Sequence, residues 1–355
     1  MTPRRRLRGI RVVECGHLIA GPFAGTILSY FGADVIKVEP PTGDQVRQYR
    51  SLDSTGTSLW WYSLGRNKRS VAIDMRQADG RDLVRELVSQ SDVFIENFRP
   101  GRMEKWGLGP DSFESANPDL VYARISGFGQ DGPYSSRAGF ASVCEAMGGF
   151  RYVNGFPDRQ PARPNLSVGD TVAGIHAALG IVVALLGRER GVPTTAQGGG
   201  GQVVDVAIYE AMYNLMEAVV PEFDYSGEVR ERSGSTITGI VPSNTYTSQD
   251  GKDVVLAANI DSLFVRLMVA IGREDMAHDP KFRTNADRVV HQAEIDDALA
   301  AWTATQPVDA VATPGRTAFA GRRIGQDTRQ VLRDELGRSA SEIARLFEQQ
   351  IVFEQ

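Results

Sequence analysis

The segments Ile10-Arg-Val-Val-Glu-Cys15 and Asp34-Val-Ile-Lys-Val-Glu39 decide the fold of this chain. Both are short and rich in β-branched residues, which favour strands. Between them, Gly21-Pro22 opens a helical pattern that ends at Gly32. Proline is tolerated in the first turn of a helix because its missing N–H would have no partner there. A strand–helix–strand unit of this kind predicts an α/β sheet with parallel strands.

The alternation of strands and helices continues along the chain. Further strands are predicted at 69–74, 92–96, 119–126 and 202–206, and the apolar spacing predicts a helix over 80–90. Loops at the carboxyl ends of parallel strands are where α/β folds bind ligands, so the loops at 97–101 and 127–134 are candidate site walls. The first turn, 16–22, lacks the G-x-G-x-x-G pattern, which disfavours a nicotinamide dehydrogenase.

The alternation weakens after about residue 220. A hairpin is predicted over 244–258 with its turn at Asp250-Gly251. Helices are predicted at 207–218, 261–271, 288–303, 326–336 and 340–349. This second half indicates a smaller α+β domain.

Composition restricts the classes of function. The chain has 355 residues, ordinary apolar content and a net charge of −5, which argues against general nucleic-acid binding. Two cysteines and four scattered histidines predict neither a disulfide framework nor a metal site, so we expect a cytoplasmic protein. The apolar run 177–186 is too short to span a bilayer, and no membrane association is expected.

Asp170 lies in Asn165-Leu-Ser-Val-Gly-Asp-Thr-Val-Ala-Gly174, just before a long apolar helical run. A carboxylate at this place is usually a helix N-cap. The alternative is a nucleophile held at the mouth of the helix, and the stretch alone favours the cap.

Several motifs together resemble the class III coenzyme A-transferases, of the formyl-CoA transferase and carnitine-CoA transferase type. The resemblance covers most of the chain, and Asp170 falls where that family has its catalytic aspartate. Its motifs are Leu18-Ile-Ala-Gly-Pro-Phe23, Gly32-Ala-Asp-Val-Ile-Lys-Val-Glu-Pro-Pro41, Asn67-Lys-Arg-Ser70, Glu96-Asn-Phe-Arg-Pro-Gly101, Gly127-Phe-Gly-Gln-Asp-Gly-Pro-Tyr134 and Gly201-Gln-Val-Val-Asp-Val206.

The resemblance implies a Rossmann-like large domain built from both chain ends, a smaller α+β domain between them, and an interlocked homodimer. The expected domains are 1–220 (large), 221–312 (small) and 313–355 (returning to the large domain). The resemblance also implies which residues bind coenzyme A: Leu18, Ile19, Ala20, Lys68, Asn97, Phe98, Lys105 and Arg137.

The implied reaction moves coenzyme A from an acyl-CoA, with succinyl-CoA as one candidate, to a small carboxylic acid. Asp170 would form an anhydride and then an aspartyl-CoA thioester, with no tightly bound cofactor and no metal. Acyl-CoA and the acid are therefore the expected small-molecule partners.

Two alternatives stay open. An α-methylacyl-CoA racemase shares the fold, but it carries a histidine where this chain has Phe140. A non-catalytic CoA-binding protein is the other alternative, because the family pattern has a stretch near 305–313 that this chain lacks. The small domain is therefore expected to be incomplete.

Overall fold

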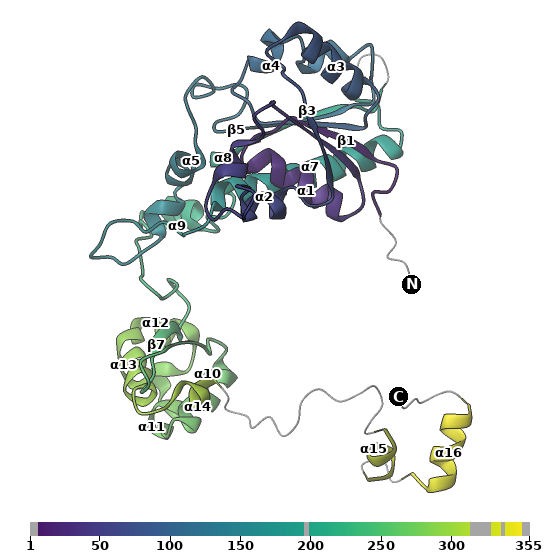
Figure 1. The fold of residues 1–355 in the computed structure, drawn as a ribbon. Helices are drawn as coiled ribbons and strands as arrows, with labels where there is room; N and C mark the ends of the chain where they lie inside the picture. The colour runs from purple at the N-terminus through teal and green to yellow at the C-terminus, as the bar shows by residue number, and fades with distance from the viewer. Residues whose placement is uncertain (1–5, 195–198, 313–327, 335–337, 350–355) are drawn as a thin grey trace. The chain divides into compact units, whose positions relative to one another are not determined.

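The computed structural model describes residues 6–194, 199–312, 328–334 and 338–349. The chain forms two compact units, Met1–Thr238 and Gly239–Gln355 (Figure 1). Each unit is described by itself below.

A parallel six-stranded sheet forms the centre of the first unit. Its strands are β1 (Arg11–Glu14), β2 (Asp34–Glu39), β3 (Lys68–Ala72), β4 (Val93–Glu96), β5 (Val121–Ser126) and β6 (Gln202–Ala207). Their order is β3-β2-β1-β4-β5-β6, and every neighbouring pair is parallel. The predicted parallel α/β sheet is thus confirmed. The order reverses between β1 and β4, which is where open α/β sheets bind ligands.

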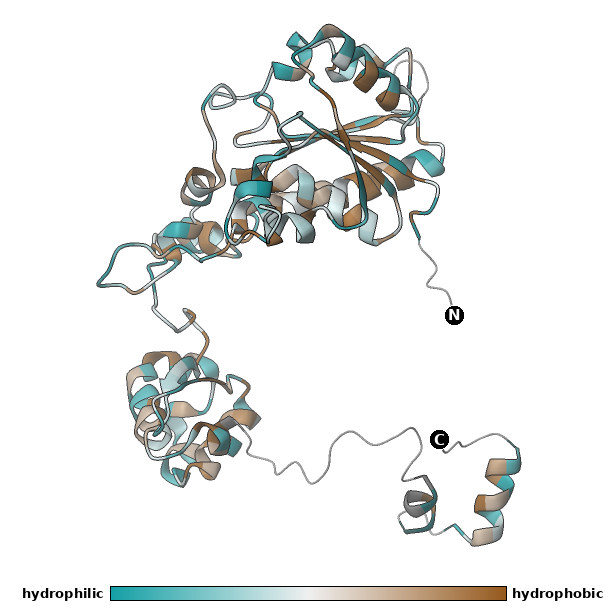
Figure 2. Cartoon of the chain, in the orientation of Figure 1, coloured by the Kyte–Doolittle hydropathy of each residue, from teal (hydrophilic) through white to brown (hydrophobic). Residues whose placement is uncertain are grey.

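Helices cover both faces of this sheet (Figure 1). One face packs on α1 (Ala20–Tyr30) and α7 (Val168–Glu189), through a core that includes Leu28, Ile125 and Ile181. The other face packs on α3 (Ala78–Ser89) and α4 (Arg102–Lys105), through Val84 and Met103. Figure 2 shows brown, apolar residues along strands at the centre of the sheet, whereas the helices on either side carry both apolar and polar residues.

Shorter elements complete the first unit. These are η1 (Gln45–Gln48), α2 (Leu59–Leu64), η2 (Pro110–Phe113), α5 (Ala141–Met147), α6 (Phe150–Val153), α8 (Ile208–Tyr213) and α9 (Val219–Ser226). The single helix predicted over 207–218 was wrong, because the chain turns after α8. Glu217 adopts φ 49°, a left-handed conformation that interrupts a helix.

Helix α7 is the longest apolar element among the described residues. It has 22 residues, and by length and composition alone it is long and apolar enough to cross a membrane. The apolar run 177–186 is only part of this helix, so the expectation that it is too short to span a bilayer does not hold for the whole of α7. Because α7 packs on α1, β5 and β6, we interpret it as a core helix of the α/β unit.

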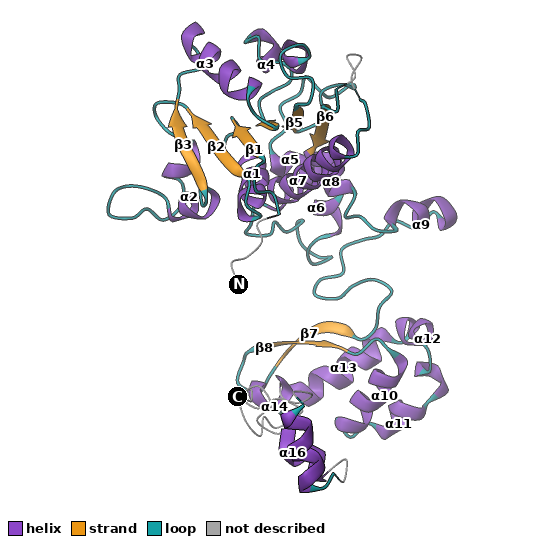
Figure 3. Cartoon of the chain, turned by 90° about the vertical axis from the view of Figure 1, so that its right-hand side faces the viewer, coloured by secondary structure: helices purple, strands orange, loops and turns teal. Residues whose placement is uncertain are grey.

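The second unit is a hairpin with helices around one core (Figure 3). The antiparallel strands β7 (Ser243–Thr247) and β8 (Asp253–Ala257) confirm the predicted hairpin. Its helices are α10 (Asp261–Ala270), α11 (Glu274–His278), η3 (Pro280–Phe282), α12 (Asn285–Val290), α13 (Gln292–Thr303) and α14 (Val308–Ala312). The guanidinium of Arg288 is fully buried and donates to the backbone carbonyls of Val241, Phe282 and Asn259.

The C-terminal part contains α15 (Thr328–Asp334) and α16 (Ala340–Glu348). Much of the predicted segment 313–355 lies outside the described residues, so its return to the large domain stays a prediction. The two compact units divide at Thr238, so that α9 belongs to the first unit, and the domain bounds implied by the resemblance stay a prediction.

Candidate active site

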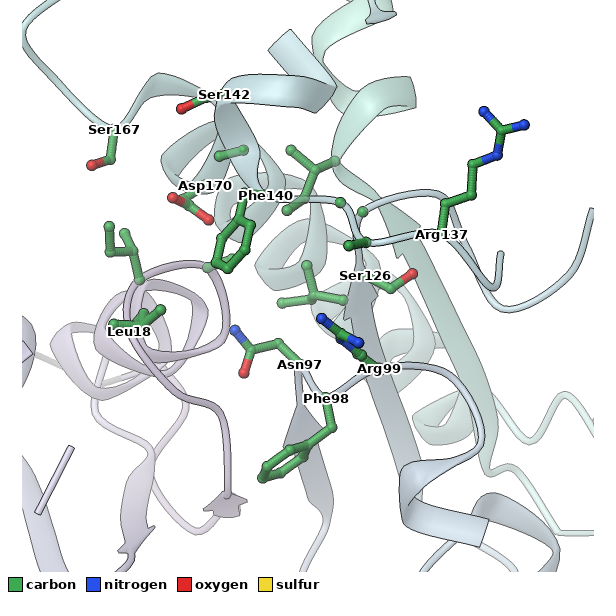
Figure 4. Close-up of a pocket in the computed structure, with 18 of the residues that line it drawn as sticks. Leu18, Asn97, Phe98, Arg99, Ser126, Arg137, Phe140, Ser142, Ser167 and Asp170 are labelled. Atoms are coloured by element: carbon green, nitrogen blue, oxygen red, sulfur yellow. The ribbon is translucent and has the colours of Figure 1, made fainter. Parts of the chain in front are cut away.

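A cavity of about 420 Å³ lies at the carboxyl ends of β4 and β5, next to the N-terminal ends of α1 and α7. Its walls are formed by residues of β5, α1 and α7 and by the loop that follows β4. The predicted site residues that line it are Leu18, Ile19, Ala20, Asn97, Phe98, Arg137 and Asp170. Figure 4 shows Asp170, Ser142 and Ser167 on one side of the cavity and Arg137 and Arg99 on the other.

Asp170 is the third residue of α7 and not its N-cap. The N-cap is Ser167, so the capping interpretation of Asp170 was wrong. Within the described residues, the Asp170 carboxylate accepts no hydrogen bond. Burial raises its pKa to about 6, and the nearby negative charge of Glu145 adds to the shift, while Arg163 opposes it. The group is therefore a desolvated carboxylate that is still mostly ionised at neutral pH.

Glu145 fixes the first turn of α7 from α5. Its side chain is fully buried, and its Oε1 accepts a hydrogen bond from the Gly169 amide at 3.1 Å. Its Oε2 accepts from Arg151 Nε at 2.7 Å and pairs with Arg151 Nη2 at 2.6 Å. A Cβ on Gly169 would lie 3.2 Å from both Ala141 Cβ and Glu145 Cγ, so glycine permits this close approach of α7 to α5. The residue before Asp170 is thus anchored by a buried carboxylate.

The turn between β1 and α1 is also held from two sides. Leu18 adopts φ 61°, which is uncommon for a branched apolar residue. Its amide donates to Asp44 Oδ1 at 3.1 Å. The neighbouring His17 makes two backbone hydrogen bonds with the Asn97 side chain. Its N–H donates to Asn97 Oδ1 at 2.6 Å, and its carbonyl accepts from Asn97 Nδ2 at 2.8 Å. These contacts hold the backbone of this turn against the cavity.

A buried ion cluster supports this turn from beneath. Lys37 Nζ lies 3.0 Å from Glu14 Oε1 and 3.1 Å from Asp44 Oδ2, and all three side chains are fully buried. Lys68 Nζ lies 2.6 Å from Glu14 Oε2. Burial opposes ionisation, but the two lysines hold the pKa of Glu14 below its usual range. Removing one partner of such a cluster leaves an uncompensated buried charge.

Two of the predicted coenzyme-binding cations lie outside the cavity. The Lys68 ammonium is buried and already bonded to Glu14 and to the Pro22 carbonyl at 2.6 Å. Lys105 ends α4 and is exposed, and it does not line the cavity. Their roles in binding stay predictions.

A second cavity, of about 240 Å³, shares Phe98 with the first. Its other aromatic walls are His17 and Trp106, whose rings meet Phe98 edge-on at centroid distances of 5.0 and 5.4 Å. Arg76 also lines it, beside a carboxylate, Asp74, that pairs with its guanidinium at 2.8 Å. The sequence did not single out this aromatic cavity.

Position 140 carries a phenylalanine that lines the first cavity, and no histidine lines that cavity among the described residues. His176 lies in α7, where its Nδ1 is 2.9 Å from the Val172 carbonyl and its Nε2 is 3.1 Å from Asn214 Nδ2. Over the described ranges, no group of three or more His, Cys, Asp or Glu side chains could hold a metal ion.

Comparisons with known proteins agree with this geometry. The sequence profile of CoA-transferase family III matches residues 7–350. The chain is 48% identical over 308 residues to a succinyl-CoA–D-citramalate CoA-transferase of Chloroflexus aurantiacus, covering 86% of this chain and 75% of that protein. It is 36% identical over 310 residues to a succinate–glutarate CoA-transferase of Agrobacterium fabrum, covering 85% and 76%. A crystal structure of a CaiB/BaiF family protein from Brucella suis matches with a TM-score of 0.75 and 33% identity, covering 93% and 86%.

Proposed function

The chain belongs to CoA-transferase family III, and from that premise we propose that it transfers coenzyme A from succinyl-CoA or a similar acyl-CoA to a small dicarboxylic acid through covalent intermediates on Asp170. One observation carries this proposal. The Asp170 carboxylate lies in the cavity, desolvated, and accepts no hydrogen bond from any described residue. A carboxylate in that state is available as a nucleophile.

The reaction has four steps, and none of them consumes water or a proton. An Asp170 oxygen attacks the thioester carbonyl, the C–S bond breaks, and the products are an anhydride and the CoA thiolate. The thiolate attacks the aspartyl carbonyl, which releases the donor acid and leaves an aspartyl-CoA thioester. The acceptor carboxylate attacks that thioester, giving a second anhydride and the thiolate. The thiolate then attacks the acceptor acyl carbon and frees Asp170.

Each of these steps develops negative charge on a carbonyl oxygen. The N-terminus of α1 begins at the cavity, and its N-cap residue, Ile19, makes no side-chain capping bond. The first N–H groups of a helix have no partner within the helix, and they carry the positive end of its dipole. We therefore assign the amides at Ile19 and Ala20 as oxyanion donors, held in place by the contacts of Leu18 with Asp44.

Coenzyme A is long enough to occupy both cavities. We assign the pantetheine and thioester to the cavity with Asp170, where Asn97 and Arg137 lie. The adenine suits the second cavity, because Phe98 and Trp106 provide aromatic faces there and Arg76 provides a cation for a phosphate.

A homodimer agrees with the surface of α7. Ile175, Leu179, Val183 and Leu186 follow helical spacing along one face, and Leu179 and Val183 are 61% and 59% exposed. An exposed apolar stripe of this kind marks an interface. Leu179→Glu should therefore shift the protein to monomers in size-exclusion chromatography, whereas Val290→Glu, at an exposed position in the second unit, should not.

The covalent mechanism is tested by peptide mass spectrometry after incubation with succinyl-CoA and then hydroxylamine, which converts activated carboxyl groups to hydroxamates. We expect the label on the peptide that contains Asp170. Asp170→Ala should abolish it, and Asp158→Asn, a matched change at an exposed carboxylate, should keep it. Label that persists in Asp170→Ala, or wild-type protein that binds CoA yet stays unlabelled with several acyl-CoA donors, would contradict the mechanism.

A further inference from the structure

We propose that Arg163, together with the hydroxyls of Ser142 and Ser167, forms a subsite that binds the second carboxylate of a dicarboxylic substrate while its first carboxyl group reacts at Asp170. The proposal rests on the transferase function proposed above and names the residues that select dicarboxylic acids over monocarboxylic ones. The three side chains line the same cavity as Asp170.

Arg163 is the cation that acts on the reacting group. Its positive charge opposes the upward shift in the pKa of Asp170. Over the described ranges, the Arg163 side chain makes no hydrogen bond and no ion pair, so its donors are available to a ligand. A guanidinium can bind a carboxylate with two parallel hydrogen bonds, which gives both strength and orientation.

The other arginines of the cavity are placed differently. Arg50 stacks over Trp60 at 3.8 Å, and Arg137 stacks over Tyr134 at 4.0 Å. Arg99 lies beside Phe98, away from Asp170 (Figure 4). Two of these arginines are stacked on aromatic rings and the third lies toward Phe98, whereas Arg163 is left for the acyl group.

The two serines supply neutral donors on the Asp170 side of the cavity (Figure 4). Ser142 is the second residue of α5, and Ser167 is the N-cap of α7. In the part of the chain that the structure describes, neither hydroxyl takes part in a hydrogen bond, and Ser167 does not cap its helix through its side chain. A hydroxyl can donate to a carboxylate oxygen that Arg163 leaves unfilled.

The chemistry of the substrate explains why such a subsite is useful. The reacting carboxyl group loses its charge when it becomes an anhydride or a thioester, so a cation cannot hold the substrate through that group at every step. A second carboxylate stays charged throughout the reaction. A cation that binds it therefore holds the acyl group through every intermediate and keeps the reacting carbon close to Asp170.

The test compares two acids of equal chain length that differ in the second carboxylate. Exchange of labelled succinate into succinyl-CoA and of labelled butyrate into butyryl-CoA are measured with wild type, Arg163→Gln and Arg163→Lys. Arg163→Gln should lower the ratio of kcat/KM for succinate to that for butyrate by on the order of 10- to 100-fold. Arg163→Lys should retain part of the ratio, because it keeps the charge but loses the bidentate geometry.

Arg159→Gln is the matched control. This arginine lies on the same segment, stacks on Phe156 and does not line the cavity, so its variant should keep the wild-type ratio. The subsite is overturned if Arg163→Gln lowers kcat/KM for succinate and butyrate by the same factor, or lowers neither. If wild-type protein shows no hydroxamate label on Asp170 and exchanges neither acid, the transferase function itself is overturned, and the subsite with it.

Discussion

Glu145→Gln isolates the effect of a buried negative charge on Asp170, the proposed nucleophile. The glutamine keeps an oxygen that can accept the Gly169 amide, so the anchor of α7 survives while the charge is removed. Because Glu145 raises the pKa of Asp170, its removal should lower that pKa from about 6. Burial remains and is the larger cause, so the pKa should stay above that of an exposed aspartate.

The magnitude follows from the geometry. Two carboxylates on the order of 7 Å apart repel by about 2 kcal/mol at an effective dielectric constant of about 20. Glu145 is bonded to the amide of the residue before Asp170 and adds to the rise of its pKa, so an effect of this order is expected. The Arg151 guanidinium pairs with the Glu145 carboxylate and offsets part of its repulsion of Asp170. A net decrease of roughly one pKa unit, about 1.4 kcal/mol, remains.

The assay is the pH dependence of kcat/KM for exchange of labelled succinate into succinyl-CoA. In the proposed mechanism only ionised Asp170 attacks, so in the wild type the rate should fall as the pH drops through about 6. In Glu145→Gln that acid limb should move down by roughly one pH unit, so near pH 5 the rate relative to its plateau rises about fivefold.

Two controls accompany this experiment. Glu114→Gln removes a charge from an exposed position away from the cavity and should leave the limb unmoved. Glu145→Gln also removes one charge from a buried ion pair, so urea unfolding should show a loss of about 3 kcal/mol. An acid limb that stays in place, or moves up, in folded Glu145→Gln would refute the electrostatic argument.

Four further outcomes are expected. Asp170→Asn should stabilise the protein at pH 8 by at most about 3 kcal/mol in urea unfolding, because the ionised carboxylate is disfavoured in its buried site. This gain should vanish below about pH 4, where the wild-type carboxyl group is neutral in both the folded and the unfolded protein. Lys37→Met should destabilise the first unit by about 3–5 kcal/mol, because it removes the cation that lies between the buried carboxylates of Glu14 and Asp44, and thermal melting measures the loss. Phe98→Ala should raise KM for acyl-CoA about tenfold with a small change in kcat, measured by steady-state kinetics, because it removes an aromatic wall from both cavities. Arg288→Met should destabilise the second unit by about 3 kcal/mol and leave the hydroxamate label on the first unit, because three carbonyl groups lose their buried donor.

The sheet could be predicted because its strands carry local signals. The strand predicted over 34–39 is β2, with the same bounds, and the Asp250-Gly251 turn lies where the hairpin was expected. The cavity loops followed from the rule that parallel strands end at one edge. Helix ends were less predictable, because Asp170 and Ser167 are both good N-caps by residue type and only the packed structure distinguishes them.

The supporting residues of the site were not predicted, because they act through contacts between distant segments. Glu145 meets Gly169 from another helix, and Asp44 meets Leu18 across the first βα unit. One signal was present in the sequence: Glu14 and Lys37 interrupt otherwise apolar strands, and a charge in a buried strand needs a partner. Their pairing explains why both charges are tolerated there.

The position of Asp170 in the first turn of α7 opposes its pKa shift. An anion there is ordinarily stabilised by about 0.3–1 kcal/mol through the helix dipole, which lowers a carboxyl pKa. The pKa is instead raised, so burial and Glu145 outweigh the dipole. The carboxylate of a capping aspartate would accept hydrogen bonds from backbone N–H groups and would therefore be a poor nucleophile. In this fold Ser167 occupies the N-cap position, and the Glu145 carboxylate lies behind the first turn of α7. Asp170 is therefore ionised at neutral pH but weakly solvated, and no described residue donates a hydrogen bond to it. A carboxylate in this state is suited to attack a thioester.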